Sequence, residues 1–520
     1  MTPSLPGLIQ QMLQADFYSH PVDTEIRLIQ THISFVILTG EFAYKVKKAV
    51  NFGFLDFSSL DQRRFFCAEE LRLNSRLAPQ LYLEVLPIYL AGDRYGFSSE
   101  GGIAEYTVKM RQFDQANLLS NLFAQDQVTA AQVQEIGIQL AKFHTQAETS
   151  PEITAFGSSA AVRQVAEDNY HSTAKYIGIA QTQLQFDQTR AFTEQCFSQQ
   201  EHLFEQRQHQ GKIKECHGDL HLKNICLYGG NVQIFDCIEF NQAFRNSDVV
   251  YDAAFLVMDL EFRGRRDLAN LFLNTYLEQS GDYSALALLP LYLSMRAYIR
   301  AKVTSFLLDD PNIAPDLKQS AQIEATAYYT LAWQYTQTGT GSLILMCGLS
   351  GTGKSTVAAG LAPKVQAIQI RSDAVRKHLG GIPLNSRGDQ QLYSPEMTSK
   401  TYQTLIDYGV TLARAGFRVI LDAKFDQVEQ RSQALAQAAG IPVKILYCQA
   451  DQATLTQRLS DRAAANTDIA DATADLLSSQ IANFATFTAQ ELNHLISLDT
   501  RTAIDWVALI EQLGFKSWTV

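Results

Sequence analysis

The chain has 520 residues, of which 46% are hydrophobic and 19% charged, a composition typical of a globular protein. This length exceeds one hydrophobic core and predicts roughly two to four domains. The formal net charge of −11 gives no support to general binding of nucleic acids or membranes, although a local basic groove is compatible with it.

The cellular compartment can also be predicted from the sequence. The first residues lack the basic end and apolar core of a secretory signal, and no segment approaches the ~18 to 20 apolar residues of a membrane span. The seven cysteines form no CxxC pair and no cluster with zinc spacing, and their odd number excludes a complete disulfide framework. We therefore expect a cytoplasmic protein with reduced thiols, and its oligomeric state stays open.

The N-terminal part predicts a strand-rich lobe. Two β-branched and aromatic runs joined by a turn at Gly40–Glu41 indicate a hairpin, and a helix and two further strands follow it. The expected strands are 33–39, 42–50, 81–89 and 103–110, and the expected helix is 59–77. From 118 to 335 the pattern is mainly helical, apart from a strand-loop-strand island at 213–240.

The island carries a pattern suited to phosphoryl transfer. His217, Asp219 and Asn224 form HxDxxxxN, and Asp236 follows at the end of an apolar strand. Such a reaction needs a carboxylate that orients the acceptor hydroxyl and ligands for the Mg²⁺ that bridges the ATP phosphates. We assign Asp219 to the first role, Asn224 and Asp236 to the second, and His217 to organising the loop. A polar hairpin with incidental acids is the alternative.

A lysine on the second strand of the hairpin is the candidate partner of the α and β phosphates. Lys45 is preferred because it follows Ala-Tyr as the lysine of a V-A-I-K strand follows its apolar pair. Lys47 lies on the same face and remains an alternative. The expected partner on the next helix is Glu70, with Glu69 as the alternative. An exposed charged surface would also explain these residues.

Two further pairs of charged residues have helical spacing. Asp248 and Asp252 are four residues apart, and we expect one of them to anchor the HxDxxxxN loop through backbone N–H groups. Arg296 and Arg300 share a helix face and could bind an acidic acceptor, but a solvated helix face explains them equally well.

The motifs CHGDLHLKN and IFDCIEF resemble those of the aminoglycoside phosphotransferase (APH)/choline-kinase-like family, over about residues 25 to 310. The resemblance implies a protein-kinase-like bilobal fold and phosphorylation of hydroxyl groups on small molecules. It also suggests Glu239 as an additional polar contact near the metal. The chain departs from the pattern by lacking a GxGxxG loop. Thr31, Ser34 and backbone groups of the hairpin are expected to cover the phosphates instead.

A small, polar segment at 336–342 (TQTGTGS) marks the expected domain boundary, which gives domains 1–335 and 343–520. Beyond it, short apolar runs alternate with helical segments, a pattern typical of a parallel sheet with crossover helices. The expected strands of this α/β domain are 343–347, 365–370, 418–421 and 443–448.

The second domain opens with a P-loop. Its sequence GLSGTGKS fills GxxxxGK[ST] between a predicted strand and a predicted helix. Small residues let backbone N–H groups converge on phosphate oxygens, and the helix N-terminus adds partial positive charge. Lys354 would reach the β and γ phosphates, and Ser355 would ligate Mg²⁺. The expected phosphate-binding residues are Gly348, Ser350, Gly351, Thr352, Gly353, Lys354, Ser355 and Thr356.

Five more residues complete this predicted site. Asp373, after the second strand, could orient or deprotonate an acceptor hydroxyl, and Arg376 could hold an anionic part of the acceptor. Asp422 ends another strand and could bind Mg²⁺ through water. Arg458 and Arg462, one helical turn apart, could belong to a mobile lid with the stretch AAANTDIADA. The alternatives are that Asp373 caps a helix and that the two arginines form a solvated face.

These motifs resemble the AAA-type, zeta-toxin and polynucleotide-kinase-like group of small P-loop kinases, and also gluconate kinases, over about residues 342 to 515. The acidic pair of a motor ATPase is absent, because Asp422 is followed by Ala423. We expect a fusion of two ATP- and Mg²⁺-dependent kinases that act on hydroxyls of small molecules, with nucleic-acid and membrane partners disfavoured. The alternatives are a polynucleotide 5′-kinase-like second half, or one half that only regulates the other.

Overall fold

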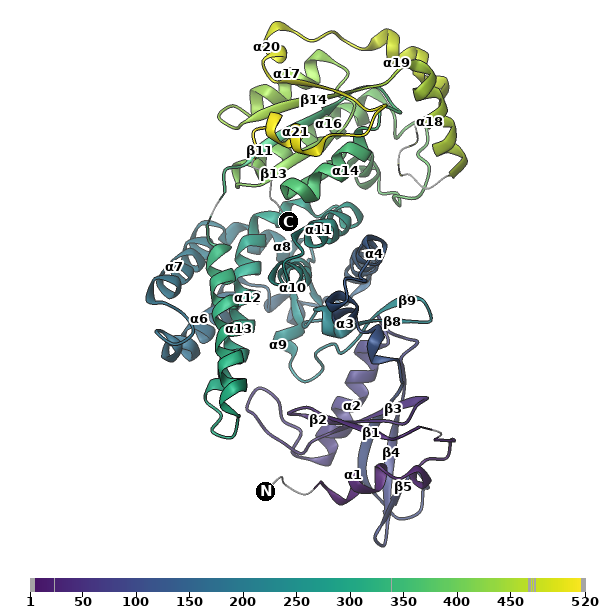
Figure 1. The fold of residues 1–520 in the computed structure, drawn as a ribbon, viewed down its shortest axis with the longest axis vertical. Coiled ribbons are helices and arrows are strands. Elements are labelled where there is room, and N and C mark those ends of the chain that lie inside the picture. The colour runs from purple at the N-terminus through teal and green to yellow at the C-terminus, as the bar shows by residue number, and fades with distance from the viewer. Residues whose placement is uncertain are drawn as a thin grey trace. The chain divides into compact units, whose positions relative to one another are not determined.

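The computed structural model describes residues 5–22, 24–337, 339–465, 469, 471 and 474–515 (Figure 1). Its contacts divide the chain into two compact units. The first unit comprises 1–139, 143–168 and 197–259, and the second comprises 140–142, 169–196 and 260–520. Among the described residues, no helix is long and apolar enough to cross a membrane.

The first unit contains a six-stranded antiparallel sheet in the order β1-β2-β3-β6-β4-β5. The predicted hairpin is present, with a left-handed Gly40 at its turn. The two strands that flank the sheet, β1 and β5, were not predicted. The strands are β1 Arg27–Gln30, β2 Ser34–Leu38, β3 Phe42–Lys47, β4 Tyr82–Ala91, β5 Arg94–Gly96 and β6 Gly102–Arg111.

Helix α2 (Leu60–Asn74) packs on this sheet and brings Glu70 toward strand β3. A capping box starts the helix, because the Ser59 side chain and the Gln62 side chain bond reciprocally to each other's backbone N–H. Aromatic and aliphatic side chains, including Phe35, Tyr44 and Ile88, form a core on the sheet. Helix α1 (Gly7–Met12) contributes Ile9 and Met12 to that core.

The predicted island folds as two short ladders around the HxDxxxxN loop. Strands β8 (Ile225–Tyr228) and β9 (Asn231–Ile234) form a hairpin. Gly229 and Gly230 join them and both have positive φ, which is the geometry that a two-residue hairpin turn favours. The second ladder pairs β7 (Ile213–Glu215) with β10 (Asn246–Asp248). The predicted strand-loop-strand arrangement is therefore confirmed.

Helices make up most of the chain between the first sheet and the P-loop. They are α3 Leu119–Ala124, α4 Ala130–Gln146, α5 Pro151–Ala155, α6 Ser159–Thr173, α7 Gln183–Gln199, α8 Glu201–His209, α9 Gln242–Arg245, α10 Val249–Phe262, α11 Arg266–Ser280, α12 Leu289–Ser305 and α13 Pro315–Gln334. Arg296 on α12 is buried rather than solvated.

The second unit contains a five-stranded parallel sheet in the order β12-β13-β11-β14-β15. Its centre is apolar on both faces, as expected when crossover helices cover a parallel sheet. Four of its strands were predicted, and β15 was not. The strands are β11 Ser342–Cys347, β12 Ala367–Arg371, β13 Arg418–Asp422, β14 Val443–Gln449 and β15 Leu495–Asp499. The helices are α14 Lys354–Val365, α15 Ser372–Leu379, α16 Pro395–Arg414, α17 Val428–Gln437, α18 Gln452–Ala465, α19 Leu477–Asn483, α20 Ala489–Leu492 and α21 Trp506–Gln512.

Helix α11 belongs to the second unit and packs against the edge strand β12. The Asn274 amide donates to the Ala367 carbonyl at 3.0 Å and accepts from the Gln369 N–H at 2.7 Å. Asn270 also donates to Ala367, at 3.0 Å. These side chains satisfy backbone groups that an edge strand otherwise leaves unpaired. The two units therefore do not follow the predicted boundary at 336–342, and separate folding of domains 1–335 and 343–520 stays a prediction.

Candidate active sites

The first candidate site is centred on the lysine that was predicted on strand β3. The Lys45 Nζ lies 2.7 Å from Glu70 Oε1 and 2.8 Å from Asp236 Oδ1. Lys45 and Asp236 are 191 positions apart in the sequence. The fold thus joins the hairpin, helix α2 and the end of the island. The predicted pair of Lys45 with Glu70 is present, the contact of Lys45 with Asp236 was not predicted, and the phosphate-binding role of Lys45 stays a prediction.

Lys47 takes part in the same network. Its Nζ lies 2.6 Å from Glu70 Oε2 and also bonds Glu239, and the Lys47 side chain has no exposed area. Burial alone would raise the pKa of Glu70, but Lys45 and Lys47 outweigh it and lower that pKa to about 2. Glu69, the alternative partner, instead pairs with Arg72 at 2.9 Å. Both lysines therefore contact Glu70, and Glu239 contacts Lys47. The expected place of Glu239 near a metal stays a prediction.

The HxDxxxxN loop brings its polar side chains together. The Asn224 amide donates to Asp219 Oδ2 at 3.0 Å, and the Asp219 N–H donates to His217 Nδ1 at 3.2 Å. His217 Nε2 donates to the Phe235 carbonyl at 2.9 Å, so His217 organises the loop as expected. Asp236 has φ of 64°, a left-handed conformation that is uncommon for a residue other than glycine. Such strain is often found at functional sites.

Asp252 on helix α10 anchors this loop by binding its backbone. Its two carboxylate oxygens accept hydrogen bonds from the backbone N–H groups of His217, at 3.1 Å, and Gly218, at 2.8 Å. One of the two predicted anchors is thereby confirmed, while Asp248 binds Arg207 instead. Asp259, seven residues further along α10, accepts another hydrogen bond, from the Leu222 N–H at 3.0 Å.

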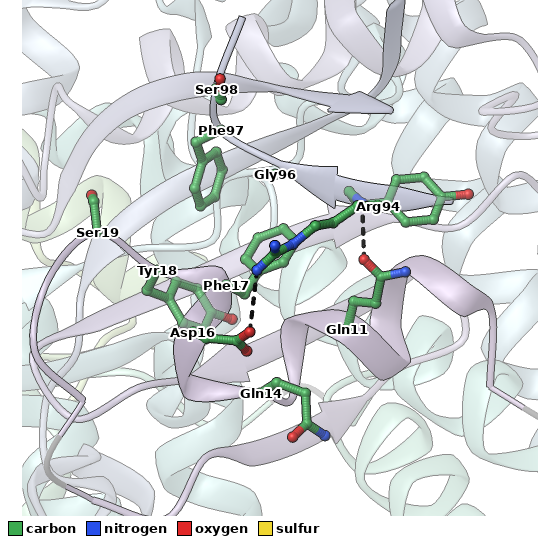
Figure 2. A pocket seen from close by; sticks show the side chains of 11 residues that line it. Gln11, Gln14, Asp16, Phe17, Tyr18, Ser19, Arg94, Gly96, Phe97 and Ser98 are labelled. Carbon is green, nitrogen blue, oxygen red and sulfur yellow. Dashed lines mark hydrogen bonds and ion pairs between the residues drawn. The ribbon is translucent and has the colours of Figure 1, made fainter. Parts of the chain in front are cut away.

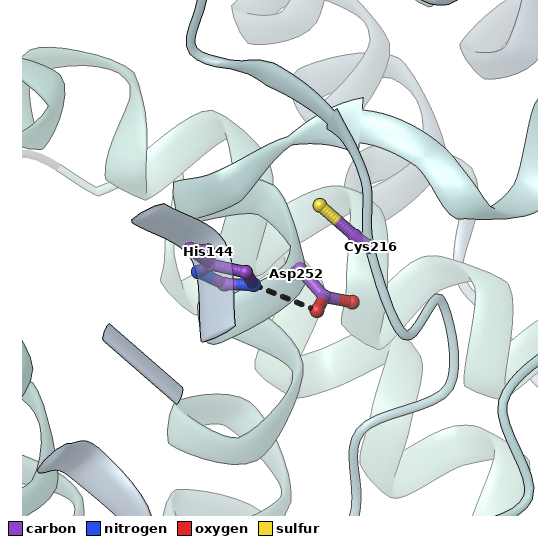
Figure 3. Close-up of side chains that lie close together, drawn as sticks. All are labelled: His144, Cys216 and Asp252. Carbon is purple, nitrogen blue, oxygen red and sulfur yellow. Dashed lines mark hydrogen bonds and ion pairs between the residues drawn. The ribbon is translucent and has the colours of Figure 1, made fainter. Parts of the chain in front are cut away.

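A buried trio surrounds the anchor, formed by His144, Cys216 and Asp252 (Figure 3). His144 Nε2 lies 3.1 Å from Asp252 Oδ2. Burial raises the pKa of the Cys216 thiol well above its usual value, which disfavours the thiolate that a metal would need. Both Asp252 oxygens also serve the loop. The trio therefore fits a structural support of the HxDxxxxN loop better than a metal site.

The turn between β1 and β2 carries Thr31 and Ser34, which were expected to cover the phosphates in the absence of a glycine-rich loop. Thr31 Oγ1 accepts from the Ser34 N–H at 2.9 Å, so the threonine side chain closes this turn. The Ser34 hydroxyl is buried and has no hydrogen-bond partner among the described residues. In this conformation Ser34 cannot cover a phosphate from the surface, contrary to expectation.

The second candidate site is the P-loop between β11 and α14. Gly348, Gly351 and Gly353 have φ of 134°, 84° and 79°, conformations that side chains other than that of glycine rarely allow. A Cβ at Gly348 would lie 2.5 Å from the Cys448 carbonyl oxygen. The glycines thus permit the close turn that a phosphate cradle requires. Ser350 N–H donates to Gln480 Oε1, at 3.1 Å.

Lys354 and Asp422 lie within this second site. Lys354 Nζ donates to the Leu349 carbonyl at 2.7 Å, folded back over the P-loop. Burial lowers the pKa of Lys354, and the charge of Asp422 opposes that shift. Asp422 is buried at the end of β13 and accepts from Gln369 at 3.0 Å. Ser355 and Thr356 occupy the next positions of helix α14, with Ser355 partly buried and Thr356 exposed.

The acceptor candidates lie on helix α15 beside the sheet. Its N-cap is Arg371, so Asp373 lies within the first turn and is not the capping residue. Arg376 is buried and its Nη1 donates to the Leu392 carbonyl and to Thr398, both at 3.1 Å. Arg376 Nε is buried without a hydrogen-bond partner among the described residues. The Nε–H group of this guanidinium is therefore a donor that no described residue uses.

Arg458 on helix α18 binds the P-loop backbone. Its Nη2 donates to the Thr500 carbonyl at 2.7 Å, and its Nη1 lies 3.4 Å from the Gly351 carbonyl. Thr500 in turn donates to the Thr352 carbonyl, at 2.8 Å. Arg462 lies one turn further along α18, and half of the predicted lid that follows lies outside the described residues. Sequence reasoning missed Thr500 and Gln480, because they come from distant segments without a motif.

A hollow of about 650 Å³ lies in the first unit, beside helix α1 and strand β5 (Figure 2). Its lining is aromatic and polar, with an ion pair of 3.3 Å between Arg94 and Asp16. None of the predicted site residues contributes to it.

Comparisons with known proteins cover both parts of the chain. The sequence model of the AAA domain family matches residues 343–487. The chain is 33% identical over 463 residues to uncharacterized protein Rv2004c of Mycobacterium tuberculosis (strain H37Rv), a match covering 86% of this chain and 89% of that protein. A putative aminoglycoside phosphotransferase from Ralstonia eutropha JMP134 matches with a TM-score of 0.39 and 12% identity, over 64% of this chain and 97% of its own. A gluconokinase from Sinorhizobium meliloti 1021 matches with a TM-score of 0.25 and 17% identity, over 34% of this chain and 91% of its own.

The AAA domain match, the parallel sheet with its P-loop and the lysine–glutamate–aspartate network of the first unit define the class of protein. It is a protein of mixed α/β fold with an AAA domain that carries a P-loop. The match of 463 residues is longer than either predicted domain, so it runs through both. The chain therefore belongs to the family of the mycobacterial protein Rv2004c.

Proposed function

We propose that this protein is a bifunctional kinase, in which each site transfers the γ-phosphoryl group of Mg-ATP to a hydroxyl of a small-molecule acceptor. The observation that carries the proposal is that each unit holds its own lysine beside its own acidic residues, an arrangement that suits binding of phosphates and Mg²⁺. These are Lys45 with Asp236 in the first unit and Lys354 with Asp422 in the second.

In the first site, Asn224 and Asp236 would hold Mg²⁺, which would supply positive charge to offset the negative charge of the ATP phosphates. Lys45 would leave Asp236 to contact the α and β phosphates, while Glu70 keeps hold of its ammonium group. A carboxylate oxygen of Asp219 would accept the proton of the acceptor hydroxyl as its oxygen bonds to the γ-phosphorus. The bond to the β,γ-bridging oxygen breaks, and ADP leaves.

In the second site, the P-loop N–H groups and Lys354 would bind the phosphates, and Ser355 and Asp422 would hold Mg²⁺ directly or through water. Asp373 would accept the acceptor's proton. The unused Nε of the buried Arg376 would donate to an anionic or polar group of the acceptor, which would satisfy a donor that is costly to leave unpaired. The net charge of −11 disfavours a polynucleotide as that acceptor.

The test is a metabolite screen with γ-labelled ATP on the full-length chain. The wild type is compared with two variants, Asp236→Asn and Lys354→Ala. The control is Lys364→Ala, because Lys364 is exposed and lies on helix α14 together with Lys354. We expect two sets of phosphorylated products, one lost in each variant and both kept in the control. A single set lost in both variants, or transfer only to oligonucleotide 5′-hydroxyls, would overturn the proposal.

A further inference from the structure

Helix α11 precedes the segment 343–487 that matches the AAA domain family, yet it lies beside α14 and along the edge strand β12 (Figure 1). Its contacts with that strand recur at every fourth residue of the helix and at every second residue of the strand. They join Asn270 to Ala367, Asn274 to Gln369 and Glu278 to Arg371. Four helical residues rise about 6 Å and two strand residues about 6.6 Å, so the two elements stay in register.

The last of these contacts is an ion pair. Glu278 Oε1 lies 3.5 Å from Arg371 Nη1, and the two side chains are only 23% and 16% exposed. A second bond fixes the same end of the helix, because His378 Nε2 on α15 donates to the Glu278 carbonyl at 2.8 Å. The C-cap of the helix is Gly281, where a Cβ would lie 3.0 Å from the His378 ring. Glu278 is therefore held beside the sheet through both its backbone and its side chain.

Arg371 connects this contact to the candidate metal ligand of the second site. It is the last residue of β12 and lies directly across from Asp422, the last residue of β13. Arg371 Nε lies 3.8 Å from Asp422 Oδ2, the oxygen that also accepts from Gln369 Nε2 at 3.0 Å. Both contacts use Oδ2, which leaves Oδ1 for Mg²⁺ or for a water bound to it. Such an oxygen beside the P-loop suits Mg²⁺, a hard cation that prefers oxygen ligands.

The position of Arg371 creates a competition that Glu278 reduces. A guanidinium always carries its charge, so beside Asp422 it competes with a metal cation for that carboxylate. Asp422 also faces the charge of Lys354. Glu278 contacts the same guanidinium from the helix and supplies a second negative charge. Glu278, Arg371 and Asp422 together carry one net negative charge, whereas Arg371 and Asp422 alone would carry none.

We infer that Glu278 is a positioning residue of the second site, which holds Arg371 at the edge of the sheet and thereby keeps the charge of Asp422 available to Mg²⁺. The inference rests on the proposed function, because it concerns the metal ligand of that same site. Glu278 acts through Arg371 and not on the reacting atoms. The second site thus depends on a residue that precedes the segment matching the AAA domain family.

The experiment uses full-length Asp236→Asn, in which only the second site is expected to bind strongly, and a non-hydrolysable ATP analogue. Titration calorimetry at a series of Mg²⁺ concentrations gives the Mg²⁺ requirement, the concentration at which the affinity reaches half of its maximum. Glu278→Gln should raise this requirement about tenfold, because loss of a nearby negative charge weakens the attraction for a divalent cation. Arg371→Gln should lower it. Glu278→Asp and the double variant Glu278→Gln/Arg371→Gln keep the net charge of the parent and should lie close to it.

The opposite signs separate this role from a merely structural one. Glu278→Gln and Arg371→Gln break the same ion pair, so a pair that only ties helix α11 to the sheet would give both variants the same shift or none. Either result would overturn the inference. If Glu278→Gln does not fold, the shift in Arg371→Gln still decides. Asp267→Asn is the matched control and should change nothing, because Asp267 lies on the same helix but pairs with Arg265 at 2.9 Å.

Asp422→Asn distinguishes failure of the inference from failure of the proposed function. It should raise the Mg²⁺ requirement of the parent protein, because it removes the charge that is proposed to hold the metal. If it does so while Glu278→Gln has no effect, the inference is wrong and the proposed function stands. If Asp422→Asn leaves the requirement unchanged, Asp422 does not hold the metal, and the proposed function of the second site fails together with the inference.

Discussion

The two candidate sites differ in how the chain builds them. The predicted phosphate-binding residues of the second unit are nearly contiguous, from Gly348 to Thr356, and three glycines set their geometry. The lysine network of the first unit joins residues 23 to 192 positions apart and is held by buried ion pairs. A site built from one loop can lose a charge without losing its shape. A site built from long-range ion pairs depends on the same charges for its fold and its chemistry.

The largest effects are expected at Asp219 and Asp373, the two carboxylates that we propose accept the proton of the acceptor hydroxyl. Asp219→Asn and Asp373→Asn should each slow transfer at their own site by ~10² to 10⁴-fold and leave the other site unchanged, because general-base positioning has about that magnitude. Steady-state kinetics with an acceptor for each site, beside ATP affinity by calorimetry, provides the measurement. If either variant transfers phosphate at the wild-type rate, that carboxylate has no role in the reaction.

Glu70→Gln tests whether the buried ion pairs of the first unit stabilise the fold. It leaves Lys45 and Lys47 buried without their shared partner, and breaking such a buried pair costs about 3 to 5 kcal/mol. Urea unfolding should show this loss, whereas the more exposed Glu84→Gln should change stability by no more than about 1 kcal/mol. A Glu70→Gln protein as stable as wild type would mean that the network does not support the fold.

Lys354→Ala is the counterpart in the second unit. The affinity of that site for ATP should fall by about 1.5 to 3 kcal/mol, the value of a hydrogen bond to a charged group. The stability of the protein should change little or rise, because burial already lowers the pKa of Lys354 and makes its charge unfavourable there. Calorimetry and urea unfolding of Lys354→Ala and Lys364→Ala would check both. A large loss of stability would show that the P-loop also depends on its charge.

The smallest effect is the pH dependence of stability. The pKa of Glu70 is lowered from 4.5 to about 2, so the folded state holds its proton less tightly than the unfolded state. The stabilisation from its ion pairs is therefore complete above about pH 4.5 and is lost as the pH falls toward 2. Urea midpoints measured from pH 6 downward should decline less steeply in Glu70→Gln than in wild type. Equal slopes would contradict the assigned ionisation.

The sequence predicted the P-loop more completely than the lysine network, for a physical reason. The P-loop geometry follows from local glycines, but the sharing of Glu70 by Lys45 and Lys47 depends on how helix α2 packs on strands β4 and β6 of the sheet that contains β3. Short edge strands such as β1 and β15 have half-exposed residues and no continuous apolar run, so their pattern resembles that of loops. The contact of helix α11 with strand β12 is made by asparagine amides, which leave no hydrophobic signal.

The most direct test of two separate nucleotide sites is the number of non-hydrolysable Mg-ATP analogue molecules bound to the full-length chain, measured by titration calorimetry. The account predicts two equivalents for wild type and one strong equivalent for each of Asp236→Asn and Lys354→Ala. It predicts no strong binding when the two changes are combined. One equivalent in wild type, or loss of all binding in either single variant, would contradict it.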